Sequence, residues 1–420
     1  MQRVRWIGAI IMSILFVGVE LAFSYENIDD ALSNGISNGD VIFYGVHTTD
    51  TSSQQDPKNA NAGYGAGSIG LAYRSEFYKN VRFMISFRAS SMFYQLHTDS
   101  LWDDDINSPN RKGSKGDGSM DFYANYRTML GQSYIEYSNG KTSVQAGRIF
   151  AKAQWADRLV DGVYISNKSL PDTLIEVFWA KNNGYVQYNK MTAMSNVNPH
   201  NTLGLFGVRL KHSFFDEILS LEGFYNGAPS IFNAFGVKLN TKYTHSSAYV
   251  GGSLSVSSTL EGSHSLKGNS RDSFVVDVRA YLGVKDIFES SANGLELSGG
   301  FIQSGANGVG SLNIIGNNVS PFFMWGGRAF LLGDEAGLGF GKINFTIHRI
   351  SLAFVYGTTR FTKQATQNAI FDRVNELNVL CEIGISEHFM VLFNLLNTHG
   401  GNKLIYPHQN ALHFGLKLSF

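Results

Sequence analysis

Residues 274–284, which read Phe274-Val-Val-Asp-Val-Arg-Ala-Tyr-Leu-Gly-Val284, decide the fold class. Every even-numbered position in this stretch is apolar, whereas Asp277, Arg279 and Tyr281 occupy odd-numbered positions. Successive side chains of a β-strand point to opposite faces, so the pattern predicts a strand with one apolar and one charged face. The charged residues lie in the middle of the strand and all on one face, so that face must be in contact with water.

The same alternation recurs along the chain, in residues 81–88, 376–385 and 412–420. A strand of this kind fits two folds. In a soluble sandwich, the apolar face is the core and the charged face meets solvent. In a transmembrane β-barrel, the apolar face meets lipid and the charged face lines a wet lumen. Periodicity alone does not choose between these folds.

The connections between the alternating segments are short and long in turn. Short connections, interpreted as periplasmic turns, fall at 77–80, 138–141, 168–172, 214–217, 243–246, 285–293, 333–341 and 386–388. The connections at the opposite end of the strands are mostly long and are interpreted as extracellular loops. They fall at 48–62, 97–120, 149–160, 182–200, 227–231, 259–272, 305–320, 358–373 and 398–410. The sequence therefore predicts an all-β, antiparallel, up-and-down transmembrane barrel of 18 strands. Residues 342–357 change phase near His348 and fit one bulged strand or two short ones, so 16 strands is the alternative.

The N-terminus predicts export. Arg3 and Arg5 precede an apolar run that ends at the small-residue pattern Ala22-Phe-Ser24, as in a signal peptide covering residues 1–24. A permanent anchor helix is the alternative, although the run is shorter than the ~20 residues that a span needs. Residues 25–38 are then a short periplasmic arm and residues 39–420 the barrel. The chain after Ser24 has no stretch of 18 apolar residues, so entry into a membrane requires a closed barrel, which pairs every backbone group.

Composition excludes several classes of protein. The 420 residues include 34 Lys and Arg against 34 Asp and Glu, so the chain lacks the net positive charge of a nucleic-acid binder. Its single Cys excludes a disulfide framework. The 11 His include no H-x-x-x-H pair of the kind that binds zinc. We therefore predict neither catalysis, nor a metal site, nor a cofactor.

Two segments resemble a known family. Leu130-Gly-Gln-Ser-Tyr-Ile-Glu-Tyr137, followed after a turn by Val144-Gln-Ala-Gly-Arg148, is similar to a stretch of the Opr-family (OprD-like) porins of Gram-negative bacteria. Phe420, which ends an alternating strand, resembles the signal that the outer-membrane barrel assembly machinery reads. The resemblance implies an 18-strand porin of the outer membrane, whose third loop, near 149–162, folds inward and narrows the pore.

The same resemblance implies that the constriction carries charged side chains, here Arg148, Lys152, Asp157 and Arg158. The sequence departs from the family because the proline expected in this loop is absent between 149 and 162. Basic residues on such a wall guide carboxylate-bearing solutes in the family.

Alternation adds further inward-facing cations, among them Arg82, Arg88, Arg209 and Arg279. We expect Arg82, Arg88, Arg148 and Arg158 to favour anionic or zwitterionic solutes in a water-filled channel. The alternative is that each cation pairs with a carboxylate on a neighbouring strand and stabilises the wall.

The predicted function is passive diffusion of small hydrophilic solutes. The alternatives are a non-conducting barrel that displays its loops as an adhesin, and a barrel phospholipase, which is disfavoured because the chain is too long for a barrel of ~12 strands. The expected partners are outer-membrane lipid, lipopolysaccharide and the solutes, in a monomer or a homotrimer.

Overall fold

The computed structural model describes residues 24–50, 61–96, 128–151, 154–156, 158–188, 190–265, 272–287, 293–313, 316, 319–322, 333–365, 368–400 and 408–420. The predicted signal peptide, apart from Ser24, lies outside these residues, as do Lys152 and Asp157. In the described residues, a short helix precedes the sheet, α2 (Ile28–Ser33), whose N-cap Asn27 accepts a hydrogen bond from the backbone of Asp29 at 2.9 Å.

The sheet is a closed antiparallel barrel of 18 consecutive strands with one short extra strand, β10 (Ser195–Asn196). The barrel strands are β1 (Ile36–Asp50), β2 (Asn61–Arg74), β3 (Val81–Leu96), β4 (Thr128–Ser138), β5 (Thr142–Phe150), β6 (Leu159–Asn167), β7 (Thr173–Gly184), β11 (Leu205–Phe214), β12 (Leu219–Ala228), β13 (Phe232–His245), β14 (Ala248–Glu261), β15 (Ser273–Lys285), β16 (Gly294–Ser304), β17 (Gly337–Ile347), β18 (Ile350–Ala365), β19 (Asn368–Gly384), β20 (Phe389–His399) and β21 (Gln409–Ser419). Pairing of β1 with β21 closes the ring, from Asp40 opposite Ser419 to Asp50 opposite Gln409. The predicted fold and strand number are confirmed. The barrel begins at Ile36, three residues before the predicted boundary.

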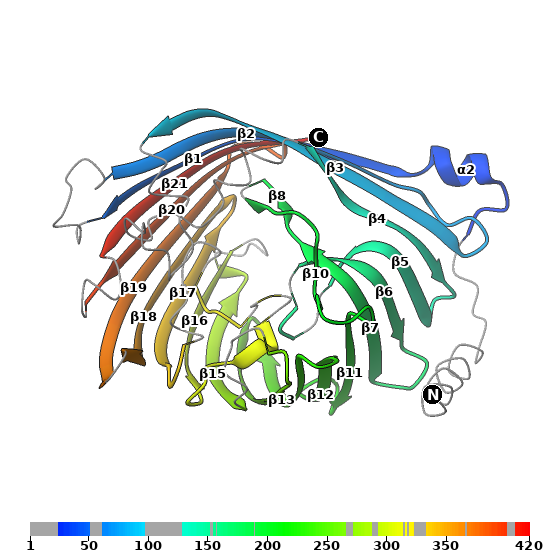
Figure 1. Cartoon of the computed structure of the whole chain (residues 1–420). Coiled ribbons are helices and arrows are strands. Elements are labelled where there is room, and N and C mark those ends of the chain that lie inside the picture. The colour runs from blue at the N-terminus through cyan, green and yellow to red at the C-terminus, as the bar shows by residue number, and fades with distance from the viewer. Residues whose placement is uncertain are drawn as a thin grey trace.

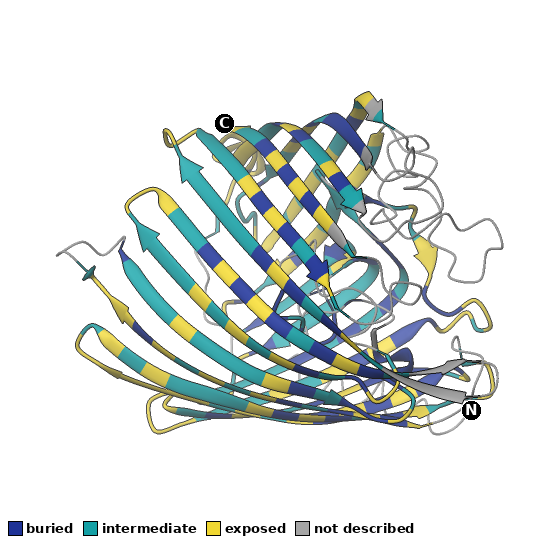
Figure 2. Ribbon diagram, turned by 90° about the vertical axis from the view of Figure 1, so that its left-hand side faces the viewer, coloured by how far each residue is buried: buried dark blue, intermediate teal, exposed yellow. Residues whose placement is uncertain are grey.

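The outer surface of the barrel is apolar. Phe235 and Val237 on β13, and Leu254 on β14, are 46–53% exposed, whereas Ser255 and Ser257, at the alternate positions of β14, are buried on the inward face. Figure 2 shows this alternation of exposed and buried positions along the strands. An outer surface of exposed apolar side chains is suited to contact with the hydrocarbon of a lipid bilayer. Among the residues that the structure describes, no helix has the length and apolar character needed to cross a membrane.

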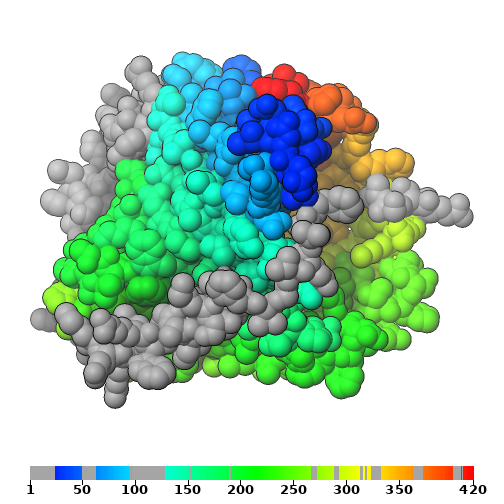
Figure 3. All heavy atoms as spheres, turned by 90° about the vertical axis from the view of Figure 1, so that its right-hand side faces the viewer, coloured from blue at the N-terminus to red at the C-terminus, as the bar shows by residue number. Residues whose placement is uncertain are grey.

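Both termini of the described chain lie at the end of the barrel that carries the short turns. Figure 3 shows α2, in dark blue, beside the C-terminal residues, in red. The backbone of Gly39 and that of Phe420 exchange hydrogen bonds of 2.7 and 3.0 Å. In this way the C-terminal strand is fixed to the first one at the turn end.

Two predicted connections are wrong. The turn expected at 333–341 is largely the start of β17, and the true turn joins β17 to β18 at His348 and Arg349, where His348 has a φ of 51°. Gly339 and Gly341, which fall within the expected turn, face open space on the outside of the strand. The long loop expected at 358–373 is instead the paired upper part of β18 and β19, which remain in register as far as Ala365 and Asn368.

Several connections at the opposite end fold into the barrel. A small hairpin, β8 (Val186–Gln187) with β9 (Lys190–Met191), follows β7 and lies inside the barrel in Figure 1. Met191 is fully buried and packs with Ile42, Tyr44 and Tyr64 of the β1–β2 wall. A 3-10 helix, η4 (Gly310–Asn313), belongs to the connection between β16 and β17.

Candidate channel lumen

The inward face of the barrel carries many ionisable side chains, assigned from strand register and burial. They are Asp40, Arg74, Arg82, Arg88, Glu136, Glu176, Arg209, Lys211, Glu222, Lys238, Lys242, Asp277, Arg279, Lys285, Glu296, Lys342, Glu376, Glu382 and Lys417. This polar interior beneath an apolar exterior is the inverse of a soluble protein and matches a transmembrane barrel.

Four of the predicted lumen cations are held by carboxylates of the wall. Arg82 contacts Glu136 at 2.7 Å, and Arg88 binds both carboxylate oxygens of Asp40, at 2.9 and 2.7 Å. Arg209 pairs with Glu176 and lies 3.8 Å from Glu222, while Arg279 pairs with Asp277 at 2.8 Å. The geometry therefore favours the wall-stabilising alternative for these pairs, since each positive charge is balanced locally.

Arg148 does not face the lumen, so its predicted position in the constriction is wrong. Its partners across the sheet are Ser133 and Asp161, whereas its neighbour Ile149 is buried in the interior. Arg148 makes two hydrogen bonds to Asp161, at 2.7 and 3.4 Å, and a third to the carbonyl of Leu130 at 2.8 Å. The guanidinium is thus fixed on the outer surface of the wall.

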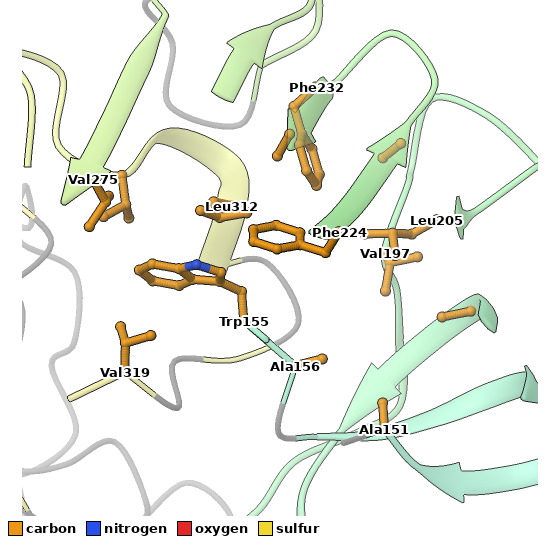
Figure 4. Close-up of a cluster of buried hydrophobic side chains, with 14 of the residues drawn as sticks. Ala151, Trp155, Ala156, Val197, Leu205, Phe224, Phe232, Val275, Leu312 and Val319 are labelled. Carbon is orange, nitrogen blue, oxygen red and sulfur yellow. The ribbon is translucent and has the colours of Figure 1, made fainter. Parts of the chain in front are cut away.

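The connection after Arg148 does fold inward. Trp155 is 1% exposed and packs in a cluster with Phe224 of β12, Val275 of β15 and Leu312 of η4, which Figure 4 shows around the indole. Gln154 donates a hydrogen bond of 2.8 Å to Ser255 on β14. Residues 154–156 therefore reach across the interior from β5 to the far wall.

Arg158 lies at the end of this inward segment. Its guanidinium donates to the hydroxyl of Tyr185 at 2.8 Å and to the side chain of Asn183 at 3.3 Å, and it lies 4.9 Å from the centre of the Tyr185 ring. Arg158 and Arg88 therefore border the same region of the interior, because Tyr185 and Arg88 line one cavity of about 340 Å³. Burial raises the pKa of Tyr188, in the same inward connection, to about 12, so this phenol is neutral at pH 7.

A second cavity, of about 410 Å³, lies against β13–β17 and has a cationic lining. Its cations are Lys242, Arg279, Lys285 and Lys342, and its carboxylate is Glu296. With Asp277, which pairs with Arg279, four positive charges face two negative ones, a formal excess of two.

Aromatic rings accompany the charges in this cavity. Tyr249 donates to Glu296 at 2.9 Å, and the ammonium groups of Lys242 and Lys285 lie 5.1 and 5.7 Å from the Tyr249 ring. Arg279 lies 5.6 Å from the Phe340 ring and also donates to the carbonyl of Val319, which belongs to the connection between β16 and β17. The cavity thus offers cations and ring faces together.

The sequence interpretation did not single out these lysines, although a signal for them existed. Lys242 has the same parity as Lys238 on its strand, and Lys285 has the same parity as Arg279. Strand alternation therefore places them on the inward face. In the described part of the chain, no three His, Cys, Asp or Glu side chains gather as a metal site would require.

The barrel resembles solved porin structures. OccK9 (OpdG) of Pseudomonas aeruginosa superposes with a TM-score of 0.72 at 8% identity, over 93% of this chain and 99% of that one. OccAB4 of Acinetobacter baumannii gives a TM-score of 0.66 at 10% identity, over 91% and 98%. OpdK of Pseudomonas aeruginosa, in a structure with vanillate, gives 0.65 at 9% identity, over 91% and 98%.

No protein-family model matches the chain, and no curated protein matches it in sequence. The structural likeness nevertheless spans nearly the whole length of both partners in each comparison. The chain therefore has the fold of the OprD-like (Occ/Opd) porins, a closed 18-strand barrel of the outer-membrane type.

Proposed function

We propose that this protein is an outer-membrane channel for passive diffusion of small hydrophilic solutes, with a preference for carboxylate-bearing anions. The observation that carries the preference is the cavity with four cations, Lys242, Arg279, Lys285 and Lys342, against Glu296 and Asp277. Positive charge in a narrow passage with low-dielectric walls raises the local concentration of anions.

The aromatic lining supports small, partly apolar carboxylates as solutes. Tyr249, Tyr281 and Phe340 line the cavity beside its cations. A ring or short apolar chain can lie against these faces while its carboxylate meets a lysine. The OpdK structure with vanillate, an aromatic carboxylate, makes this class of solute a natural first probe for a barrel of the same fold.

The test is ion selectivity in planar bilayers. We expect the reversal potential under a KCl gradient to show anion preference, and the triple variant Lys242→Gln, Lys285→Gln, Lys342→Gln to move it toward cations. Lys168→Gln, in an exposed turn between β6 and β7, is the matched control and should leave it unchanged. Clear cation preference in the wild type would overturn the proposed anion bias.

The predicted cluster of Arg82, Arg88, Arg148 and Arg158 is a separate contribution to test. Because Arg82 and Arg88 pair with carboxylates, their neutralisation should shift selectivity less than the loss of the lysines, and neutralisation of Arg148, on the outer surface, should leave it unchanged. Removal of these arginine charges one at a time would separate the two groups.

A non-conducting display barrel is the second candidate, because apolar packing occupies part of the interior. Trp155, Val319 and Phe322 are buried inside the barrel together with wall residues. Absence of conductance from correctly folded protein would favour this function over a channel. We further propose that the protein is not an enzyme, which incubation with phospholipid substrates would test.

A further inference from the structure

The outer surface of the barrel has a pair of arginines that nothing in the channel function requires. Arg360 of β18 and Arg373 of β19 are directly opposite each other in the antiparallel register, and both side chains are exposed. Directly opposed residues on one face of a sheet have Cβ atoms about 5 Å apart, and like charges in such positions repel.

Strand alternation places both arginines on the lipid-facing side. Phe354 and Tyr356 precede Arg360 on the same face of β18 and are 40% and 49% exposed. Leu377 lies on the same face of β19 as Arg373, four residues nearer the turn end of the barrel, and is 37% exposed. The arginines thus continue the apolar outer stripes and do not belong to the lumen.

Their height matches the edge of the membrane. Arg360 lies ten residues beyond Ile350, where β18 leaves its turn. Ten residues rise about 33 Å along a strand, or about 25 Å at a tilt of about 40°, which is about the height of the apolar band of such barrels. The outward residues change accordingly from apolar to polar, since Thr358 and Asn375 intervene and hydrogen-bond to each other at 2.8 Å.

The two guanidinium groups are not balanced by the wall. Within the described residues, neither has a carboxylate within the 4.0 Å of an ion pair, in contrast to Arg82, Arg88, Arg209 and Arg279. Glu335, in the turn just before β17, accepts a hydrogen bond from Thr362 at 2.8 Å. Asp372 accepts one from the backbone of Arg373. A site with two adjacent cations, at the level of lipid headgroups, suits a doubly charged oxygen anion.

We propose that Arg360 and Arg373 bind a phosphate group of an outer-leaflet lipid, the phosphorylated glucosamine headgroup of lipopolysaccharide. Planar guanidinium groups bind phosphate oxygens in pairs, and one phosphate between them removes the repulsion that the register imposes. This inference rests on the proposed outer-membrane location but not on conduction.

The experiment measures lipid binding to the full chain in detergent, by native mass spectrometry. The probes are bis-phosphorylated lipid A and the same lipid with both phosphates removed. We expect the phosphorylated lipid to bind at least tenfold more tightly, and Arg360→Gln with Arg373→Gln to abolish the difference.

Arg349→Gln is the matched control, because Arg349 is an exposed arginine at the opposite, turn end of the barrel. It should leave binding of the phosphorylated lipid unchanged. Heat-modifiable migration on gels verifies that each variant is folded.

Three results would overturn the inference: equal binding of the two lipids, unchanged binding by the double variant, or equal loss in Arg349→Gln. Displacement of the lipid by millimolar inorganic phosphate would also contradict it, because it would indicate a general anion site. Dimers or trimers that the double variant dissociates would assign the pair to a subunit interface instead. Bilayer conductance of the double variant should equal that of the wild type, so failure of this proposal and failure of the channel function are distinguishable.

Discussion

Removal of the Trp155 side chain should release the inward segment between β5 and β6 and enlarge the channel. The indole is 1% exposed and contacts side chains from β12, β15 and η4. Substitution of a buried Trp by Ala costs about 3–5 kcal/mol. If that loss falls on the docking of residues 154–156, the undocked population rises between about 100-fold and about 4,000-fold, because each 1.4 kcal/mol is a factor of ten.

Single-channel recording in planar bilayers measures this change. The wild type should give one steady current level, and Trp155→Ala should add a larger level or frequent transitions to it. Phe235→Ala, which removes a ring that is 48% exposed on the outer face, is the control and should keep the wild-type level. A folded Trp155→Ala barrel with an unchanged single level would refute the idea that this segment narrows the passage.

Three further predictions concern charge and backbone. Glu296→Gln removes a carboxylate from the cationic cavity, so the reversal potential should move toward stronger anion preference; a shift toward cations would contradict the assignment. Glu136→Gln removes the partner of Arg82 and should also favour anions, by a smaller amount because that pair is outside the cavity. Gly147→Ala should lower the yield of heat-modifiable barrel, because φ is +132° and a Cβ would lie 2.3 Å from the carbonyl oxygen of Ser133; in Gly341→Ala, where the Cβ meets open space, the yield should match the wild type.

Strand number and topology were predictable because the alternation of apolar and polar residues follows directly from the two environments of a barrel strand, lipid on one face and water on the other. A lipid-facing residue must be apolar, and the residues before and after it face the water-filled lumen. The outward and inward faces of β15 can therefore be assigned from residues 274–284 alone. The exact positions of the turns were harder to predict. Glycine at Gly339 and Gly341 indicates a turn in most contexts, yet here it occupies outward strand positions where no side chain is needed.

The upper part of β18 and β19 was mistaken for a loop for a related reason. Thr358, Arg360 and Thr362 are polar because they lie beyond the apolar band, and polarity alone does not distinguish a paired strand above the membrane from a loop. Only the register between the two strands shows that Arg360 and Arg373 are neighbours. This pairing register cannot be predicted from either strand's own sequence.

The candidate site was predicted only in part. Alternation predicts an inward position for Arg82, Arg88, Arg209 and Arg279, but the carboxylate partners of the first three come from other strands, and only Asp277, the partner of Arg279, is on the same strand. Arg148 was assigned to the constriction through the family resemblance. Its own strand gave the opposite indication, because Val144 and Ala146 share its parity and the outward face.

The inward position of the β8–β9 hairpin could not be predicted, since it depends on packing between Met191 and β1–β2, far apart in sequence. The same holds for the cavity at β13–β17, which needs five strands and the residues near Val319 to be assembled. Parity indicates which lysines face inward, but only the closed barrel brings them together.

The central claim is that this barrel conducts and prefers anions. Its most direct test is the reversal potential of the wild-type protein in a planar bilayer under a tenfold KCl gradient. The account predicts discrete conductance steps and a reversal potential on the anion-selective side of zero. Folded protein that gives no conductance, or a reversal potential on the cation-selective side, would contradict it.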